Sequence, residues 1–169
     1  MGGVNVVYKS LIPALTSNED QGYKLTCDMS LYSGSLYQLF DGNCIIQNWT
    51  ENYGGTLVVF PSNKNPTITV ECPKAITVHG VMQIGPDYKL YGVRAGGMGS
   101  FSYSDNGSSW TTISDVSKLE RNWVATKGNN TSVSDWIKKE AQGFGTHRYW
   151  RMYINRAEEF LGLNQIIFY

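Results

Sequence analysis

Arg148-Tyr-Trp-Arg-Met-Tyr-Ile154 is the stretch that decides the fold of this 169-residue chain. It alternates Tyr, Arg and Tyr with Trp150, Met152 and Ile154, and this period of two predicts a β-strand with two different faces. The following segment, 163–169, is apolar enough for a buried strand, and the sequence ends on it. We therefore expect the last residues to close a sheet that the upstream chain builds.

Short runs of β-branched and aromatic residues recur upstream, separated by Gly, Pro, Asn and Asp. Turn chemistry predicts tight connections at Pro73-Lys74, Gly85-Pro86 and Asp105-Asn-Gly107. Gly80 and the glycine-rich segment 95–99 indicate bulges or tight turns. The runs themselves predict strands at residues 23–28, 56–60, 67–71, 75–84, 90–94, 100–104 and 110–113.

Helical signal is weak. Residues 36–40 form a short apolar turn or helical piece that leads into Asp41-Gly-Asn43, and the one plausible helix lies near 134–142, with Ser134 or Asp135 as its cap. No βαβ rhythm is present, so the pattern predicts an all-β, antiparallel two-sheet sandwich with at most one short helix. We expect an N-terminal arm or edge strand over 1–15 and the sandwich domain over 16–169.

Charge and hydropathy exclude several kinds of partner. Lys and Arg number 14, as do Asp and Glu, with no basic run longer than two residues, so nucleic acid is not expected. No segment approaches the roughly 18 apolar residues of a membrane-spanning helix. The N-terminus has neither the basic start nor the apolar run of a signal peptide, so we expect synthesis in the cytoplasm without a secretion signal.

Catalytic and metal-binding motifs are not found in the sequence. Neither His79 nor His147 lies in a motif that presents a nucleophile, and no spacing of carboxylates selects an acid–base pair. His79 is expected to be structural. For His147, which lies at the mouth of a loop, a ligand-binding role is as well supported as a structural one. We therefore expect no enzyme, and we expect free thiols rather than a disulfide framework at Cys27, Cys44 and Cys72.

Aromatic residues in polar, Asn- and Gly-rich surroundings are the remaining functional signal. Their rings suit stacking on sugars, with Arg, Asn or His side chains holding the hydroxyl groups. For any single ring, plugging an end of the sandwich is the favoured alternative. The candidate glycan-binding residues are Trp49, Tyr53, Arg94, Trp123, Trp136 and His147.

The order of these segments resembles the galactose-binding-like superfamily, specifically discoidin (coagulation factor 5/8 type C) domains and the related carbohydrate-binding modules. The resemblance rests on four pieces over residues 16–169, namely Leu39-Phe-Asp-Gly-Asn43 with Trp49, 68–84, 101–113, and 147–154 with 163–169. It implies a jelly-roll sandwich and a non-enzymatic binding function.

The opening Ile12-Pro-Ala-Leu-Thr-Ser-Asn18 resembles the variant found in bacteriophage tail and virion proteins. This resemblance implies a multimeric virion component, of tail or head-fibre type, that binds host cell-surface carbohydrate and contacts other virion proteins. A purely structural virion protein (decoration, collar or adaptor) and an accessory module of a larger glycoside-processing enzyme are the alternatives.

The resemblance also bears on calcium. Many carbohydrate-binding members hold a structural Ca²⁺ through an Asp-Gly-Asn turn and a Glu near the C-terminus. Asp41 and Asn43 match the turn, but Gln165 stands at the place of that Glu. The loss of a carboxylate weakens a hard-cation site, although carbonyl oxygens can still bind the ion. A calcium site at Asp41 and Asn43 is thus an open alternative.

Overall fold

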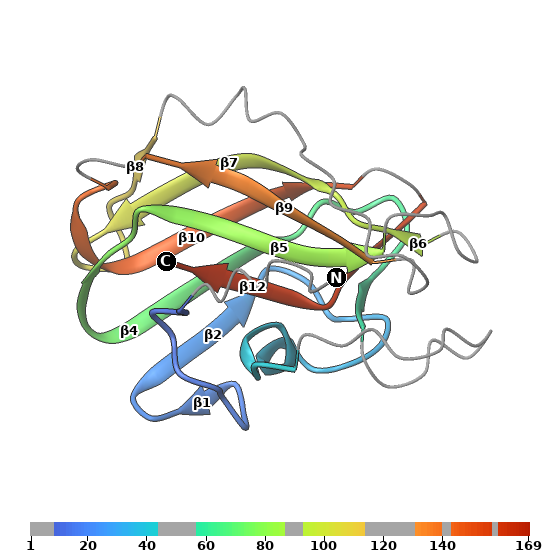
Figure 1. Ribbon diagram of the computed structural model, residues 1–169, viewed down its shortest axis with the longest axis horizontal. Helices are drawn as coiled ribbons and strands as arrows, with labels where there is room; N and C mark the ends of the chain where they lie inside the picture. The colour runs from blue at the N-terminus through green and yellow to red at the C-terminus, as the bar shows by residue number, and fades with distance from the viewer. Residues whose placement is uncertain (1–8, 44–56, 87–92, 114–130, 140–142, 157–158) are drawn as a thin grey trace, which may run out of the picture.

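The chain folds as a β-sandwich, and its described residues include one 3₁₀ turn (Figure 1). The computed structural model describes residues 9–43, 57–86, 93–113, 131–139, 143–156 and 159–169. Its elements are β1 Glu19–Asp20, β2 Tyr23–Cys27, η1 Leu36–Phe40, β3 Val58–Phe60, β4 Thr67–Thr77, β5 Gly80–Pro86, β6 Val93–Arg94, β7 Gly97–Ser104, β8 Thr111–Thr112, β9 Thr131–Lys138, β10 Thr146–Asn155, β11 Phe160–Leu163 and β12 Gln165–Phe168.

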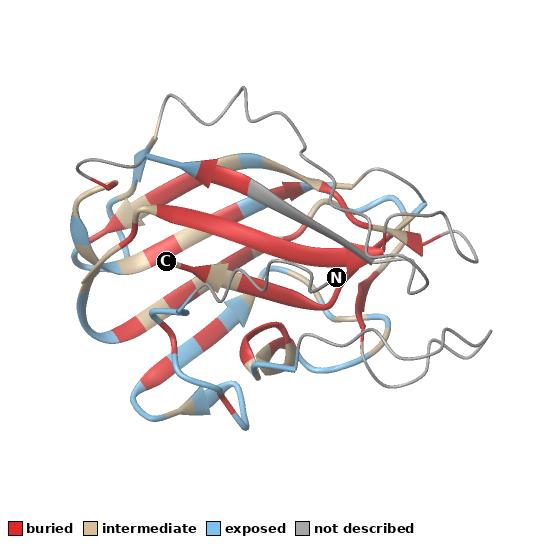
Figure 2. Cartoon of the chain, viewed as in Figure 1, coloured by how far each residue is buried: buried red, intermediate tan, exposed pale blue. Residues whose placement is uncertain are grey.

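The larger layer is a six-stranded sheet in the order β1-β2-β4-β10-β7-β8, with antiparallel neighbours throughout. The predicted alternation of β10 is confirmed, because Trp150, Met152 and Ile154 are 0% exposed while Tyr153 is 37% exposed. Figure 2 shows the same alternation of buried and more exposed residues along this layer. Local side-chain pattern thus sets which face of the sheet turns inward.

The second layer consists of two three-stranded sheets, β3-β11-β6 and β12-β5-β9. The strand expected over 163–169 is split at Asn164, so that β11 joins one sheet and β12 the other. Asn164 itself is buried and donates its backbone N–H to the Ile84 oxygen at 2.8 Å. The all-β sandwich is confirmed, although β11 and β6 pair in parallel.

An aromatic core joins the two layers. Phe101 of β7 stacks on Trp150 of β10, with ring centroids 5.3 Å apart and planes at 16°. Phe168 of β12 meets Phe101 edge-on at 5.9 Å, and Phe40 of η1 meets Phe168 edge-on at 6.1 Å. These four residues are at most 4% exposed, so the inner faces of both layers and η1 share one core.

Four expectations about local structure were wrong. The turn expected at Gly85-Pro86 lies within β5, where both residues pair with β9, and the strand expected over 75–84 is divided between β4 and β5. The helix over 134–142 is replaced by β9, which pairs antiparallel with β5 from Gly80↔Lys138 to Pro86↔Thr131, so sheet pairing overrides the helical pattern. The turn at Pro73-Lys74 is replaced by an uninterrupted β4. Residues 72–75 lie opposite Arg148 alone, and this bulge accommodates a proline that has no N–H to donate.

Several local expectations are confirmed. Gly99 is the extra residue where the β7–β10 register shifts between Tyr153↔Ser100 and Ile154↔Met98. The hairpin turn at 105–107 connects β7 to β8, with Gly107 at a φ of 74°. The short 36–40 segment is η1. Gly80, in contrast, begins β5, where an added Cβ would overlap the Tyr169 ring.

Residues 9–15, the part of the N-terminal segment that the structure describes, pack on this domain. Ile12 and Leu15 are 3% and 2% exposed within the main core, and the backbone N–H of Leu11 donates to the Phe168 oxygen at 2.7 Å. Across the ranges that the structure covers, no helix is long and apolar enough to span a membrane.

Candidate functional site

The predicted glycan-binding residues fall into three groups. Trp49, Tyr53 and Trp123 lie outside the described residues. Arg94 and Trp136 lie in β6 and β9. His147 lies at the start of β10.

His147 lies in the large sheet and Arg94 in β6 of the second layer, near the opposite end of the sandwich. His147 is the second residue of β10, whereas Arg94 precedes Gly97, which pairs with Asn155 at the far end of that strand. At the usual rise of a strand, residues 147 and 155 are about 25 Å apart. One small ligand cannot contact both side chains.

Trp136 is buried, with 5% of its surface exposed. Its indole N–H donates to the backbone oxygen of Gly96 at 3.2 Å, which ties β9 to the segment between β6 and β7. The ring therefore fills the interior, as in the alternative of plugging the sandwich. To stack on a sugar it would have to leave the core.

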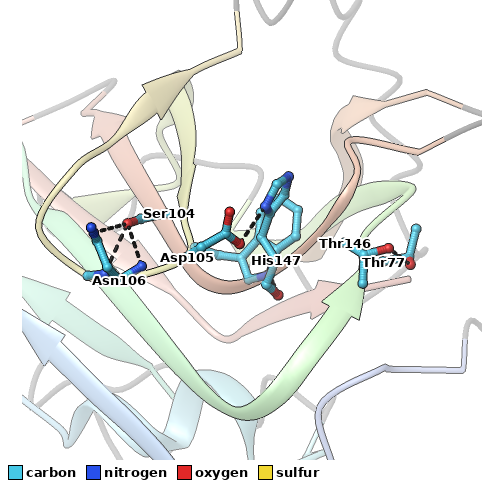
Figure 3. A network of polar contacts seen from close by, with 8 residues as sticks. Thr77, Ser104, Asp105, Asn106, Thr146 and His147 are labelled. Carbon is cyan, nitrogen blue, oxygen red and sulfur yellow. Dashed lines mark hydrogen bonds and ion pairs between the residues drawn. The ribbon is translucent and has the colours of Figure 1, made fainter.

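His147 is the centre of a polar and aromatic cluster at one end of the sandwich, which we call the His147 cluster and which comprises Tyr103, Asp105, His147 and Trp150. The imidazole stacks on the Tyr103 ring at 3.7 Å between centroids and 10° between planes. It meets Trp150 edge-on at 5.6 Å. Figure 3 shows its Nδ1 facing Asp105, and the Nδ1–Oδ1 distance is 2.8 Å.

The hydrogen bond to Asp105 determines which ring nitrogen of His147 carries the proton in the neutral imidazole. A carboxylate only accepts, so Nδ1 of His147 donates, and in the neutral ring Nε2 is left as an acceptor. The His147 side chain is 16% exposed, whereas that of Asp105 is 75% exposed. The cluster therefore presents a solvent-facing carboxylate backed by aromatic rings.

The hairpin loop beside this cluster is held by its own side chains (Figure 3). Oδ1 of Asn106 accepts from the backbone N–H groups of Ser108 and Ser109, both at 2.9 Å. Oγ of Ser104 accepts from the N–H of Gly107 at 2.9 Å and donates to Asn106 Oδ1 at 3.1 Å. These local bonds orient Asp105 toward His147.

Nothing in the described part of the cluster is arranged for nucleophilic catalysis. Among the residues that the structure describes, no hydroxyl or thiol group is hydrogen-bonded to the imidazole. The nearby hydroxyls of Thr77 and Thr146 bond to each other at 2.6 Å. The arrangement can accept and donate hydrogen bonds and offer aromatic surface, which are properties of a binding site.

Sequence reasoning missed Tyr103 and Asp105. Both lie in segments that were correctly predicted, a strand and a hairpin turn. The missing information was the register Ser104↔Tyr149, which brings the residues after Ser104 beside those before Tyr149. A prediction that paired the two aromatic strands would have placed Asp105 near His147.

The turn proposed for calcium is occupied by the side chain of Gln165, which is 2% exposed. Its Nε2 donates to Asp41 Oδ1 at 2.6 Å, to the Gln38 oxygen at 2.7 Å and to the Asn164 oxygen at 2.9 Å. Hydrogen-bond donors thus point at oxygens that a cation would need as ligands. The residues as arranged do not fit calcium, and the described ranges contain no group of three or more His, Cys, Asp or Glu suited to a metal.

The described thiols are free and unreactive in character. Cys72 is fully buried, and burial raises its pKa to about 12. Burial also raises the pKa of the Cys27 thiol. The expectation of free thiols is confirmed for Cys27 and Cys72, while Cys44 lies outside the described residues.

An open hollow of about 390 Å³ lies away from these sites, over the β1–β2 hairpin and Glu71. Oε1 of Glu71 accepts from Arg148 Nη2 at 3.0 Å and from the Tyr149 hydroxyl at 3.2 Å. Of the glycan-binding candidates that the structure describes, Arg94, Trp136 and His147, none lines this hollow.

Comparison with known proteins identifies the fold. No protein-family model matches the sequence, and no curated protein matches it. Among solved structures, CpGH89CBM32-5 from Clostridium perfringens, in complex with GalNAc-β-1,3-galactose, superimposes with a TM-score of 0.56 and 12% identity over 91% of this chain and 99% of that chain. The family 32 carbohydrate-binding module of C. perfringens NanJ, in complex with galactose, gives a TM-score of 0.51 and 12% identity over 94% and 97%.

An F5/8 type C domain from Bacteroides fragilis superimposes with a TM-score of 0.54 and 12% identity over 87% of this chain and 90% of that chain. Such likeness at low identity establishes the architecture, and it agrees with the observed two-layer β-sandwich. The chain therefore has the galactose-binding-like β-sandwich fold of discoidin (F5/8 type C) domains.

Proposed function

We propose that this protein is a non-enzymatic carbohydrate-binding domain that is carried on a bacteriophage virion and recognises a glycan on the host cell surface. The observation that supports binding most directly is the shared architecture with modules that were solved with galactose and with GalNAc-β-1,3-galactose. The superposition extends over at least nine-tenths of this chain in both cases.

The His147 cluster supports the same proposal chemically. A sugar offers hydroxyl groups and a weakly apolar ring face, and its recognition needs fixed acceptors beside aromatic surface. Asp105 is exposed, and its Oδ1 accepts a hydrogen bond from His147. Among the described residues this is its one side-chain partner, so Oδ2 is placed to accept from a sugar hydroxyl. His147 and Tyr103 stack behind it and restrict its position.

The phage location rests on the resemblance of residues 12–18, 23–26 and 40–43 to phage variants of the fold. Many copies on one particle convert a weak single-site affinity into firm attachment. A structural virion protein and an accessory module of a glycoside-processing enzyme are the two other candidate functions. The likeness to carbohydrate-binding modules favours the enzyme-linked module as much as the virion protein.

A glycan array with the purified chain in multivalent form tests the proposal. We expect binding to a defined class of glycans, with His147→Ala lowering the signal at least about tenfold if the His147 cluster is the site. His79→Ala is the matched control, because it removes an imidazole of intermediate exposure elsewhere. Trp49→Ala, Tyr53→Ala and Trp123→Ala test the candidates outside the described residues.

Each outcome separates the candidate functions. A blank array at high valency would contradict glycan binding and favour the structural virion protein. That alternative predicts that an N-terminal deletion prevents incorporation into particles. The deletion should end at residue 8, because Ile12 and Leu15 are buried in this domain's own core and their loss would unfold it.

A further inference from the structure

The Gln165 side chain lies where three separate segments of the chain meet. It leaves the first residue of β12, is 2% exposed, and reaches both the carbonyl of Gln38 in η1 and the carboxylate of Asp41 beyond it. The partners are more than 120 residues away in sequence, at separations of 127 and 124. One amide therefore anchors the turn after η1 to the last strand of the sandwich.

The orientation of this amide follows from groups whose roles cannot change. The backbone N–H of Gly42 only donates, and it points at Gln165 Oε1 at 3.2 Å. The carbonyls of Gln38 and Asn164 only accept, and they face Nε2 at 2.7 and 2.9 Å. A flipped amide would set donor against donor at Gly42 and acceptor against acceptor at the two carbonyls.

The acceptors around Nε2 are a set that hard cations prefer. They comprise the carboxylate oxygen of Asp41 and the backbone carbonyls of Gln38 and Asn164. The Asp41 carboxylate also accepts from the backbone N–H of Asn43 at 2.8 Å, which shapes the turn. In this chain the N–H groups of a neutral amide face these oxygens and satisfy them as hydrogen-bond acceptors, so no ion is required as their partner.

We propose that the primary amide of Gln165 replaces a structural divalent cation at the Gln38–Asp41 turn, so that this domain folds without calcium. The same oxygens become a cation site when the amide is exchanged for a carboxylate. This inference concerns stability and does not depend on the proposed glycan binding.

Thermal unfolding of the wild-type chain in EDTA and in millimolar CaCl₂ is the first measurement. We expect the two melting temperatures to agree within about 1 °C, because a ligand that does not bind the native state cannot stabilise it. A rise of several degrees with calcium, or calcium binding detected by titration calorimetry, would overturn the proposal.

Gln165→Glu is the decisive variant. Its carboxylate would face Asp41 and two carbonyls without a proton between them, so we expect a melting temperature roughly 5–10 °C below wild type in EDTA. Millimolar calcium should recover most of this loss. If calcium does not stabilise this variant, whether the variant is folded or unfolded in EDTA, the proposal that these oxygens are arranged to bind a cation is contradicted.

Two further variants complete the test. Gln38→Glu is the matched control, because it changes a side chain whose oxygen accepts from the Ser35 N–H at 2.7 Å and leaves in place the Gln38 backbone carbonyl that contacts Gln165. We expect no calcium dependence there. Gln165→Met keeps the length but removes the donors, so it should be destabilised in both buffers, and wild-type stability of this variant would refute a structural role for the amide.

Discussion

Trp136 offers the sharpest test of whether a predicted ligand residue is part of the core. The ring is 5% exposed and its N–H donates to the Gly96 oxygen at 3.2 Å. Truncation to alanine removes a buried aromatic ring, a change that costs about 3–5 kcal/mol in protein cores. The Gly96 carbonyl also loses its indole partner, so the upper part of this range is expected.

The assay is urea unfolding followed by far-UV circular dichroism, which does not depend on the fluorescence of the removed ring. For a domain of this size the expected loss corresponds to a melting temperature lower by about 6–20 °C. Trp136→Phe should lose only about 1–2 kcal/mol, because it keeps most of the ring and removes the hydrogen bond.

Trp110→Ala is the matched control. Trp110 is half-buried, and the Arg151 guanidinium lies over its ring at 4.2 Å from the centroid. An exposed contact of this kind contributes about 0.5–1 kcal/mol. If Trp136→Ala unfolds within about 1 kcal/mol of wild type while abolishing glycan binding, the assignment of Trp136 to the core is refuted and its role as a stacking platform is favoured.

Three further predictions follow from burial and close packing. Leu15→Ala should destabilise the domain by about 2–5 kcal/mol in urea unfolding, whereas Leu11→Ala at 39% exposure should have little effect; equal effects would contradict the packing of this segment. Because burial raises the pKa of Cys72 to about 12, the thiol stays protonated when folded but ionises when unfolded above about pH 9. Stability should therefore fall as pH rises from 9 toward 12, by up to about 1.4 kcal/mol per pH unit more than in Cys72→Ala, and identical slopes would refute this. Gly96→Ala would place a Cβ against the backbone oxygen of Asn155, so we expect a loss of at least about 2 kcal/mol in urea unfolding, and a melting temperature equal to wild type would rule out this close approach.

Local patterns in the sequence determined the elements whose structure depends on near neighbours. The alternation over 148–154 predicted which side chains of β10 are buried, because a strand turns successive side chains to opposite faces. The hairpin at 105–107 and the short turn of η1 also follow from nearby residues. The sandwich class follows from many such strands in succession.

Non-local pairing decided what the sequence left open. Residues 131–138 form β9 because β5 offers them a partner, and β4 passes through Pro73 because β10 accommodates a bulge opposite Arg148. Neither partner can be recognised from the segment's own pattern, since sheet hydrogen bonds join residues far apart in sequence.

The candidate sites divide in the same way. The sequence nominated His147 and the Asp41 turn from residue type and position, and for Asp41 from resemblance. Only the tertiary structure joined His147 to Asp105, 42 residues away, and filled the Asp41 turn with the Gln165 amide, 124 residues away. Chemical character is a property of each residue, whereas a site requires distances between residues, and the packing of the two layers sets those distances.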